Sequence, residues 1–245
     1  MQPLRVTLRL GEPIARGTFP LLLDGLLAWA VVDNELSMAT DVNDTRLVSS
    51  LATGLPLETA VVGGHEVWCA SAWMPVGRVG PTCEIDPNSY SGISQQRILT
   101  RKSDLVDFSA AVASGLVRIR TIDKDKIGPN AYVLDTSRGL FKNYHLSYTL
   151  KSVDALEAWC IGDPHLIEEY LRDIEFVGPK RRLGHGMVTS IEVVPDERAV
   201  DLWRLRPLPE RSDDIECVAV RMPARSPYWV PENAVHQEAP TAIFW

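Results

Sequence analysis

The sequence predicts an α+β fold whose core runs strand, helix, strand, strand, helix, strand. Three observations support this prediction: apolar and polar residues alternate in segments near both ends of the chain, two segments have helical periodicity, and a long middle segment is β-rich and basic. The chain has 245 residues, of which 45% are hydrophobic and 23% are charged. These values are ordinary for a globular chain with one large domain, or with a core domain that carries an insertion.

The first half of the core is predicted from three segments. Residues 4–10, LRVTLRL, alternate between apolar and polar and predict a half-buried strand. Residues 21–36, LLLDGLLAWAVVDNEL, place apolar side chains at helical spacing and predict a helix. Residues 65–76, HEVWCASAWMPV, alternate again and predict the second strand, whereas residues 37–64 lack clear periodicity and are interpreted as a variable insertion.

The second half of the core repeats this pattern. Residues 154–162, DALEAWCIG, predict a mainly buried strand, and a helix follows with Asp163 as its N-cap and Pro164 at its first position. Residues 187–195, MVTSIEVVP, predict the last strand. The complete order is the ferredoxin-like βαββαβ order, which RNA-recognition-motif (RRM-like) domains share.

This order divides the chain into a core, an insertion and a C-terminal region. The core is predicted to comprise residues 1–36, 65–76 and 154–195. A β-rich insertion covers residues 77–153, with strands near residues 116–122 and 144–151. The segment between the second helix and the last strand is a glycine-rich loop.

The C-terminal region, residues 196–245, is predicted to be an ordered, extended wrap around the core. It carries Tyr228, Trp229, Phe244 and Trp245, and large aromatic side chains are costly to leave in water. We expect Tyr228 and Trp229 to pack on their own domain. For the last two aromatic residues, packing on the domain and contact with a partner subunit are both open.

Charge and cysteine content limit the possible classes of protein. The net charge of −7 argues against indiscriminate coating of nucleic acid or membrane. The four cysteines, Cys69, Cys83, Cys160 and Cys217, have no zinc-site spacing and predict reduced thiols. The longest apolar run is far shorter than the roughly 20 residues of a membrane span, and no signal peptide is recognised. We therefore expect a cytoplasmic protein without a metal, a cofactor or a membrane partner.

The glycine-rich loop concentrates positive charge in this acidic chain. Its sequence, GPKRRLGHG, spans residues 178–186. Glycines let a backbone approach a ligand closely, and exposed N–H groups in such a turn can bind an anion. Lys180, Arg181 and Arg182 would add charge-assisted contacts to phosphates, which position a nucleic-acid backbone without reading its bases. The alternative is a solvated turn whose cations favour the C-terminus of the preceding helix.

Three further segments carry a family resemblance. They are LDGLLAWAVVDNE at residues 23–35, RLRPLP at residues 204–209 and SPYWVPE at residues 226–232. Together with the loop, they resemble the RAMP superfamily of CRISPR proteins, and specifically the Cas-five-like subunit of type IV effector complexes. Residues 37–145 contribute no motif to this resemblance.

The resemblance implies a function, a site and partners. It implies a non-catalytic subunit that caps the 5′ handle of the crRNA guide in a type IV ribonucleoprotein used in antiviral defense. The loop residues implied to contact RNA are Gly178, Lys180, Arg181, Arg182, Gly184, His185 and Gly186. The implied protein partners are a Cas-seven-like backbone subunit and a large-subunit-like protein, and contact with target DNA near its recognition motif is left open.

The basic residues of the middle region form a second candidate surface. Members of the superfamily often project a thumb-like insertion that meets RNA and the neighbouring backbone subunit. The candidates are Arg97, Arg101, Lys102, Lys124, Lys126, Arg138 and Lys142. The alternative for each of them is an ordinary solvated side chain.

Two other functions remain open. Some superfamily members cleave precursor RNA without metal by using a histidine, and here His185, between two loop glycines, is the first candidate and His145 the second. The resemblance implies that processing belongs to a separate subunit, so the expected catalytic set is empty. The third reading is a protein-interaction module that binds no RNA.

Overall fold

The computed structural model describes residues 1–38, 50–85, 93–102, 105–115, 142–211, 215–228, 230 and 233–245. The chain forms two compact units. The first contains Met1–Ser94 and Leu150–Trp245, and the second contains Gln95–Thr149. Helices and antiparallel sheets are both present, so the predicted α+β class is confirmed.

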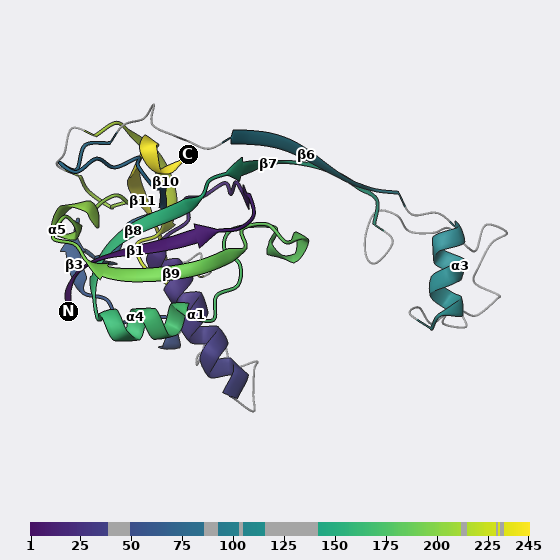
Figure 1. Ribbon diagram of the computed structural model, residues 1–245, viewed down its shortest axis with the longest axis horizontal. Coiled ribbons are helices and arrows are strands. Elements are labelled where there is room, and N and C mark those ends of the chain that lie inside the picture. The colour runs from purple at the N-terminus through teal and green to yellow at the C-terminus, as the bar shows by residue number, and fades with distance from the viewer. Residues whose placement is uncertain are drawn as a thin grey trace. The chain divides into compact units, whose positions relative to one another are not determined.

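A four-stranded antiparallel sheet forms the centre of the first unit, with the strand order β5-β8-β1-β9. Its strands are β1 (Gln2–Leu10), β5 (Met74–Pro75), β8 (Ala155–Gly162) and β9 (Val188–Pro195). Helix α1 (Leu23–Met38) follows β1 in the chain, and helix α4 (Pro164–Leu171) connects β8 to β9. Strand β1 lies between β8 and β9 (Figure 1).

One face of the sheet packs against the two helices. Leu4, Val6 and Leu8 alternate along β1 and are fully buried in a cluster with residues of α1 and α4. The start of α4 is the predicted one, because the Asp163 carboxylate accepts hydrogen bonds from the backbone N–H groups of His165 and Leu166 at 3.0 and 3.2 Å. The half-buried strand that was predicted from the alternation of residues 4–10 is therefore confirmed.

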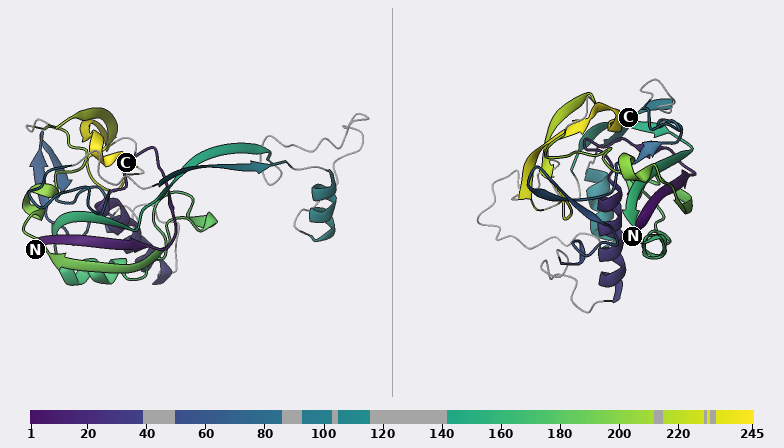
Figure 2. Two further views of the ribbon diagram at one scale, coloured as in Figure 1. Left: turned by 45° about the horizontal axis from the view of Figure 1, so that its top comes forward. Right: turned by 90° about the vertical axis from the view of Figure 1, so that its left-hand side faces the viewer.

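The opposite face of the sheet packs against the C-terminal region. Trp159 of β8 is buried in a second cluster with Leu202 of the short helix α5 (Ala199–Leu202). Strands β10 (Cys217–Pro223) and β11 (Ala234–Pro240) pair as an antiparallel hairpin, and the one-turn helix η5 (Thr241–Ile243) follows. The C-terminal region and α4 lie on different sides of the central sheet (Figure 2).

The C-terminal aromatic residues are ordered, as predicted. Tyr228, Phe244 and Trp245 pack against the second cluster, and the Trp245 indole N–H donates to the carbonyl of Trp73 at 2.8 Å. Phe244 and Trp245 therefore pack on the chain's own domain, and their contact with a partner subunit stays a prediction. Trp229 lies outside the described residues.

The predicted continuous strand at residues 65–76 is wrong. Strand β4 (His65–Trp68) pairs instead with β3 (Thr59–Val62), and the later residues reach the central sheet at an isolated bridge between Ala70 and Cys160 and at Met74–Pro75. Gly63 and Gly64 connect the hairpin with φ values of 54° and 77°, a pair of positive values typical of a two-residue hairpin turn. The two glycines lie within residues 37–64, whose sequence shows no clear periodicity.

The second unit contains parts of two long strands and a helix. Strand β6 (Ile93–Arg101) neighbours β7 (Tyr144–Ser152), and helix α3 comprises Leu105–Ala113. The strand predicted at residues 144–151 is confirmed. The one predicted at residues 116–122 lies outside the described residues. Leu150 and Lys151 lie at the end of β7 that belongs to the first unit, and they pair with β2 (Ile14–Ala15).

Within the parts of the chain that the structure describes, no helix has both the length and the apolar character needed to cross a membrane.

Candidate nucleic-acid interface

The glycine-rich loop, residues 178–186, is a folded turn that is fixed at both ends. The backbone N–H of Val177 donates to the carbonyl of Gly186 at 2.8 Å, and the N–H of Gly186 donates to the carbonyl of Pro13 at 3.0 Å. Between these ends, Arg181–Leu183 form a single 3₁₀ turn. A loop that is already ordered loses less conformational entropy when it binds a ligand.

The three loop glycines serve the backbone in different ways. Gly186 has a φ of 73°, and a Cβ there would lie 2.1 Å from the carbonyl oxygen of Val177. Gly178 has a φ of 80°, and its Cβ would lie 2.8 Å from Ile14. Gly184 has a φ of 82° and faces open space. Gly178 and Gly186 are therefore needed for close packing at the base of the loop, whereas Gly184 is needed only for its left-handed conformation.

The loop presents its three cations in different settings. Lys180 has φ 62° and ψ 23°, the left-handed region that lysine rarely adopts. The guanidinium of Arg181 lies 4.5 Å from the centroid of the Trp29 ring on α1, a cation–π contact that orients it. Arg182 is exposed. Three adjacent cations on a fixed turn create a local positive surface on an acidic chain.

The predicted site residues fall into separate groups. His185 is partly exposed and lies on the loop with Lys180, Arg181 and Arg182, as its position in the sequence requires. His145 belongs to the second unit, where its Nδ1 lies 3.1 Å from the hydroxyl of Thr100.

The candidate cations of the insertion are only partly described. Arg97, Arg101, Lys102 and Lys142 are exposed residues of the second unit. Lys124, Lys126 and Arg138 lie outside the described residues. The exposure of the first four is compatible with RNA contact and equally with simple solvation.

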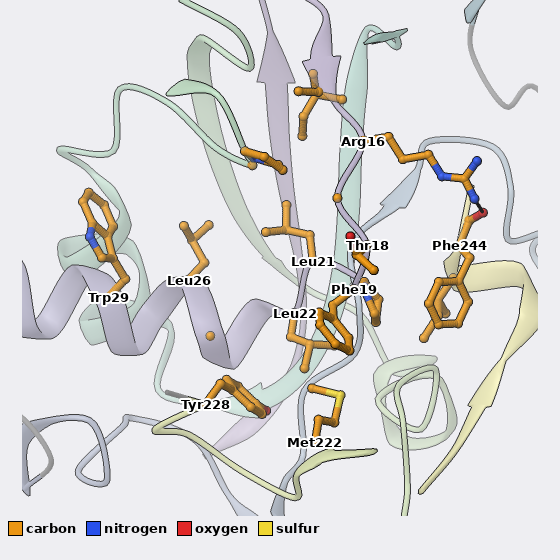
Figure 3. Close-up of a pocket in the computed structure, with 18 of the residues that line it drawn as sticks. Arg16, Thr18, Phe19, Leu21, Leu22, Leu26, Trp29, Met222, Tyr228 and Phe244 are labelled. Carbon is orange, nitrogen blue, oxygen red and sulfur yellow. Dashed lines mark hydrogen bonds between the residues drawn. The ribbon is translucent and has the colours of Figure 1, made fainter. Parts of the chain in front are cut away.

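A cleft of about 840 Å³ opens beside the loop, within the first unit. Its walls are formed by residues 14–22, by the first half of α1, by Gly178–Arg181 of the loop, and by the C-terminal region. Figure 3 shows Phe19, Leu22 and Met222 between Trp29 on one side and Phe244 on the other. The cleft therefore connects the basic loop to the C-terminal aromatic residues.

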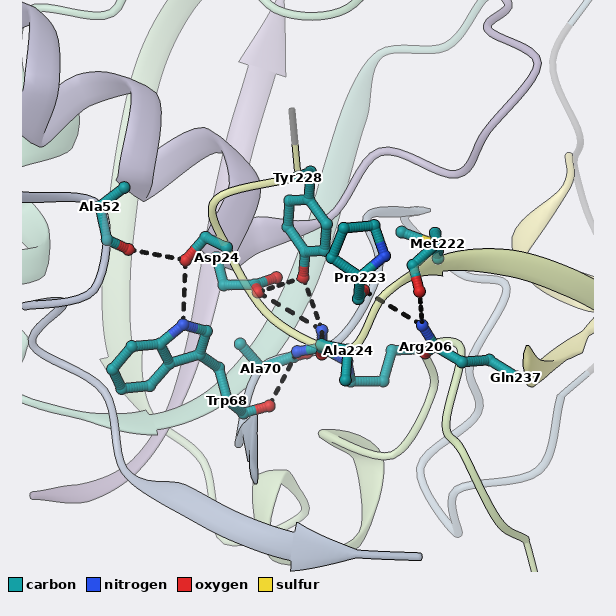
Figure 4. Close-up of polar contacts among 11 residues, drawn as sticks. Asp24, Ala52, Trp68, Ala70, Arg206, Met222, Pro223, Ala224, Tyr228 and Gln237 are labelled. Atoms are coloured by element: carbon teal, nitrogen blue, oxygen red, sulfur yellow. Dashed lines mark hydrogen bonds and ion pairs between the residues drawn. The ribbon is translucent and has the colours of Figure 1, made fainter. Parts of the chain in front are cut away.

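Behind the cleft lies a buried polar network that joins three distant segments. Asp24 of α1, Arg206 and Tyr228 meet there (Figure 4). The Arg206 guanidinium is 1% exposed and donates to the Tyr228 hydroxyl at 2.7 Å and to Asp24 Oδ2 at 3.4 Å. It also donates to the carbonyls of Trp68, Ala70 and Ala224. The Tyr228 hydroxyl in turn donates to Asp24 Oδ2.

This environment shifts two pKa values. Burial by itself would lower the pKa of Arg206, but the adjacent Asp24 carboxylate and Tyr228 more than offset it, so the pKa rises. Burial raises the pKa of Tyr228 well above its usual value. Arg206 therefore stays charged and Tyr228 stays neutral, as the hydrogen bonds require.

The network explains why three motifs of the sequence occur together. Asp24 lies in the segment 23–35, Arg206 in the segment 204–209 and Tyr228 in the segment 226–232. The resemblance of these segments to a known family was evident in the sequence, but their contact with one another was not. An arginine and an aspartate inside apolar stretches are the signal that could have indicated a buried pair.

The cleft was also missed by sequence analysis. Its rim contains Arg16 and Phe19, which lie between the strand predicted at residues 4–10 and the helix predicted at residues 21–36. Phe19 is 58% exposed. A single aromatic residue in a loop does not indicate a contact surface, because exposed apolar residues are common on proteins.

Among the described residues, no group of three or more His, Cys, Asp or Glu side chains is arranged to hold a metal ion. Cys217 and His236, the pair in the sequence that invites this question, occupy different positions of the hairpin. Cys217 lies opposite Pro240, and His236 lies opposite Arg221.

A search of the curated proteins finds no similar sequence. The family model described as "CRISPR type IV associated protein Csf3" matches residues 2–240, nearly the whole chain. The chain therefore belongs to the family of the CRISPR type IV associated protein Csf3.

Proposed function

We propose that this chain is a non-catalytic RNA-binding subunit that caps the 5′ handle of the crRNA in a type IV CRISPR effector complex. Membership of the family makes it a component of a type IV CRISPR system. The step from component to RNA-binding subunit rests on the loop at residues 178–186.

The observation that carries the proposal is the fixed basic turn. Lys180, Arg181 and Arg182 are consecutive residues of this turn. The backbone of Gly186, at the end of the turn, is hydrogen-bonded to the backbones of Pro13 and Val177. Cations at this spacing suit successive phosphates of a single strand, and backbone contacts of this kind dominate nucleic-acid affinity. The whole chain carries a net charge of −7 although the loop is positive, so the negative charge outside the loop disfavours RNA there and directs it to this loop.

The topology of the first unit supports a ferredoxin-like core of the RAMP type as part of the proposal. Along the chain, the order is β1, α1, β5, β8, α4, β9, and the sheet order is β5-β8-β1-β9. A βαββαβ chain with its first and third strands in the centre of an antiparallel sheet has this order. The glycine-rich loop then precedes the last core strand.

The proposal includes partners and a supporting RNA contact. The crRNA would be bound alongside a Cas-seven-like backbone subunit and a large-subunit-like protein. Arg97, Arg101, Lys102 and Lys142 of the second unit are proposed to add phosphate contacts. A contact with target DNA near its recognition motif would be made in the assembled complex.

The absence of cleavage is part of the proposal, and the competing function is metal-independent processing of precursor crRNA. Cleavage of this kind uses a base for the 2′-hydroxyl and an acid for the leaving oxygen. Residues 178–186 contain a single histidine, His185, and their other ionisable side chains are those of Lys180, Arg181 and Arg182. We propose that His185 contacts RNA without transferring a proton.

The test is to purify the chain with its complex and to sequence the RNA that accompanies it. The proposal predicts RNAs with a common 5′ end, protected by this subunit against exonuclease. Purified chain is then incubated with precursor RNA in EDTA, and intact precursor is expected. Cleavage of the precursor that disappears in His185→Ala would show that the chain is a processing nuclease. A complex in which this chain does not contact RNA would show that the chain is a protein-interaction module.

A further inference from the structure

The cleft of the first unit is an apolar surface that the chain leaves open. Leu21, Leu22, Leu26 and Met222 line its walls, and Phe19 on its rim is 58% exposed. A surface of this kind in a protein that belongs to a multi-component system is typical of an interaction site.

Several polar groups of the cleft walls are engaged within the chain. The Tyr228 hydroxyl donates to Asp24, and the Trp245 indole donates to the carbonyl of Trp73. The carbonyl of Phe244 accepts a hydrogen bond from Arg16 at 3.2 Å. A nucleobase carries several polar atoms on its edge and loses free energy where they find no partner, so these walls suit aliphatic and aromatic side chains better than a base.

Three arginines surround this apolar surface. Arg16, Arg181 and Arg221 all line the cleft and are exposed. Arg16 comes from the loop after β2, Arg181 from the glycine-rich loop and Arg221 from β10, so the positive charge comes from three sides. An occupant with acidic residues beside its apolar residues would match both features.

We propose that this cleft binds a segment of another protein subunit of the type IV system, which inserts large apolar side chains and carries Asp or Glu beside them. Phe19 packs against the inserted side chains, and Arg16 and Arg221 pair with the acidic residues. This site is separate in function from the RNA contact of Lys180 and Arg182. Arg181 is common to both and would bring the partner segment close to the bound RNA.

The test places a photocrosslinker in the cleft of the assembled complex. Phe19→p-benzoylphenylalanine is incorporated, the complex is reconstituted from its protein subunits and guide RNA, and it is irradiated. Val200→p-benzoylphenylalanine is the matched control, because Val200 lies on α5, outside the cleft, and is 50% exposed. Cross-linked products are identified by mass spectrometry.

The proposal predicts a specific cross-link from position 19 to a protein segment with apolar residues and adjacent Asp or Glu, which the control position does not form. A cross-link to the guide RNA would overturn the proposal in favour of a nucleotide in the cleft. A cross-link to a protein segment without acidic residues would overturn the assigned role of the arginines. The absence of any product at position 19 would mean that the cleft has no occupant.

A second measurement separates this proposal from the RNA-binding function. Phe19→Ser should lower the affinity for the partner subunit by about tenfold or more, since tenfold corresponds to about 1.4 kcal/mol. The affinity of the same variant for guide RNA should be unchanged. Loss of RNA binding with retained partner binding would contradict the docking role of Phe19, whereas a wild-type chain without RNA affinity would contradict the proposed function alone.

Discussion

At the scale of single residues, the contact between Asp24 and Arg206 connects the helix α1 with the C-terminal region. Both side chains are buried, and 182 positions separate them in the sequence. The residue types alone do not predict such a pair, because Arg204 and Arg206 in RLRPLP have the same side chain and only the second is buried. Which one turns inward is decided by packing partners that are distant in the chain.

Replacing Arg206 should therefore cost much more stability than replacing Arg204. Arg206→Met leaves the Asp24 carboxylate buried without its cation and should lower the free energy of unfolding by about 3–5 kcal/mol. Arg204→Met, the same substitution at an exposed arginine over the Trp203 ring, should cost about 1 kcal/mol or less. Urea unfolding of the two variants measures the difference, and equal losses would contradict the structural role assigned to the network.

Two buried thiols give a second prediction, which concerns pH. Burial raises the pKa of Cys69 from 9.0 to about 11 and that of Cys160 from 9.0 to about 12. Since the folded-state values are the higher ones, their contribution to stability is complete below about pH 9. It is lost as the pH rises through 11 and 12, by up to about 1.4 kcal/mol per pH unit for each thiol.

The free energy of unfolding of the wild-type chain should fall between pH 9 and pH 11. In a Cys69→Ala, Cys160→Ala variant, the fall should be shallower, whatever the stability of that variant at neutral pH. Urea unfolding at a series of alkaline pH values compares the two slopes. Parallel slopes would mean that the thiols ionise equally easily in the folded and unfolded chains.

At the scale of elements, the parts that periodicity could predict are those whose burial follows local sequence. The strand predicted at residues 4–10 is part of β1, and the helix predicted at residues 21–36 largely coincides with α1. Residues 65–76 also alternate, yet their first part pairs with β3, and the central sheet is reached at the bridge between Ala70 and Cys160 and at Met74–Pro75. Alternation reports a half-buried strand and does not report the strand with which it pairs.

The glycine-rich loop illustrates the same limit. Its charge and its glycines were evident in the sequence, but the different roles of Gly184 and Gly186 depend on the carbonyl of Val177 at the base of the loop. The hydrogen bond between Val177 and Gly186 fixes the base of the loop. The sequence could not indicate which glycine would be irreplaceable.

Alanine substitutions at these two glycines should have unequal effects. Gly184→Ala places a Cβ in open space at positive φ and should cost about 1–2 kcal/mol of stability. Gly186→Ala brings the same strain and also a Cβ 2.1 Å from the Val177 carbonyl oxygen, so the loop base must open and more stability is lost. Urea unfolding compares the two variants, and a smaller loss for Gly186→Ala would contradict the anchored geometry of the loop.

At the scale of the whole molecule, the family could be predicted from the sequence, whereas the cleft could not. The resemblance in the sequence indicated a type IV CRISPR subunit, and the family match confirms that part. RNA binding by the loop stays a prediction. The cleft could not be predicted, because residues 14–22, α1 and the C-terminal region form it jointly and no single segment contains its pattern.

The most direct test of the RNA-binding role is the salt dependence of guide-RNA affinity. We compare the wild-type chain with Lys180→Asn, Arg182→Gln, in which asparagine tolerates the left-handed backbone at position 180. The matched control, Arg9→Gln, Arg172→Gln, removes the same net charge from exposed residues outside the loop. If the loop binds phosphates, the slope of log affinity against log salt should become shallower by about 1.4 in the loop variant, roughly 0.7 for each lost contact, and should be unchanged in the control. Equal slopes for all three proteins would contradict RNA binding by the loop.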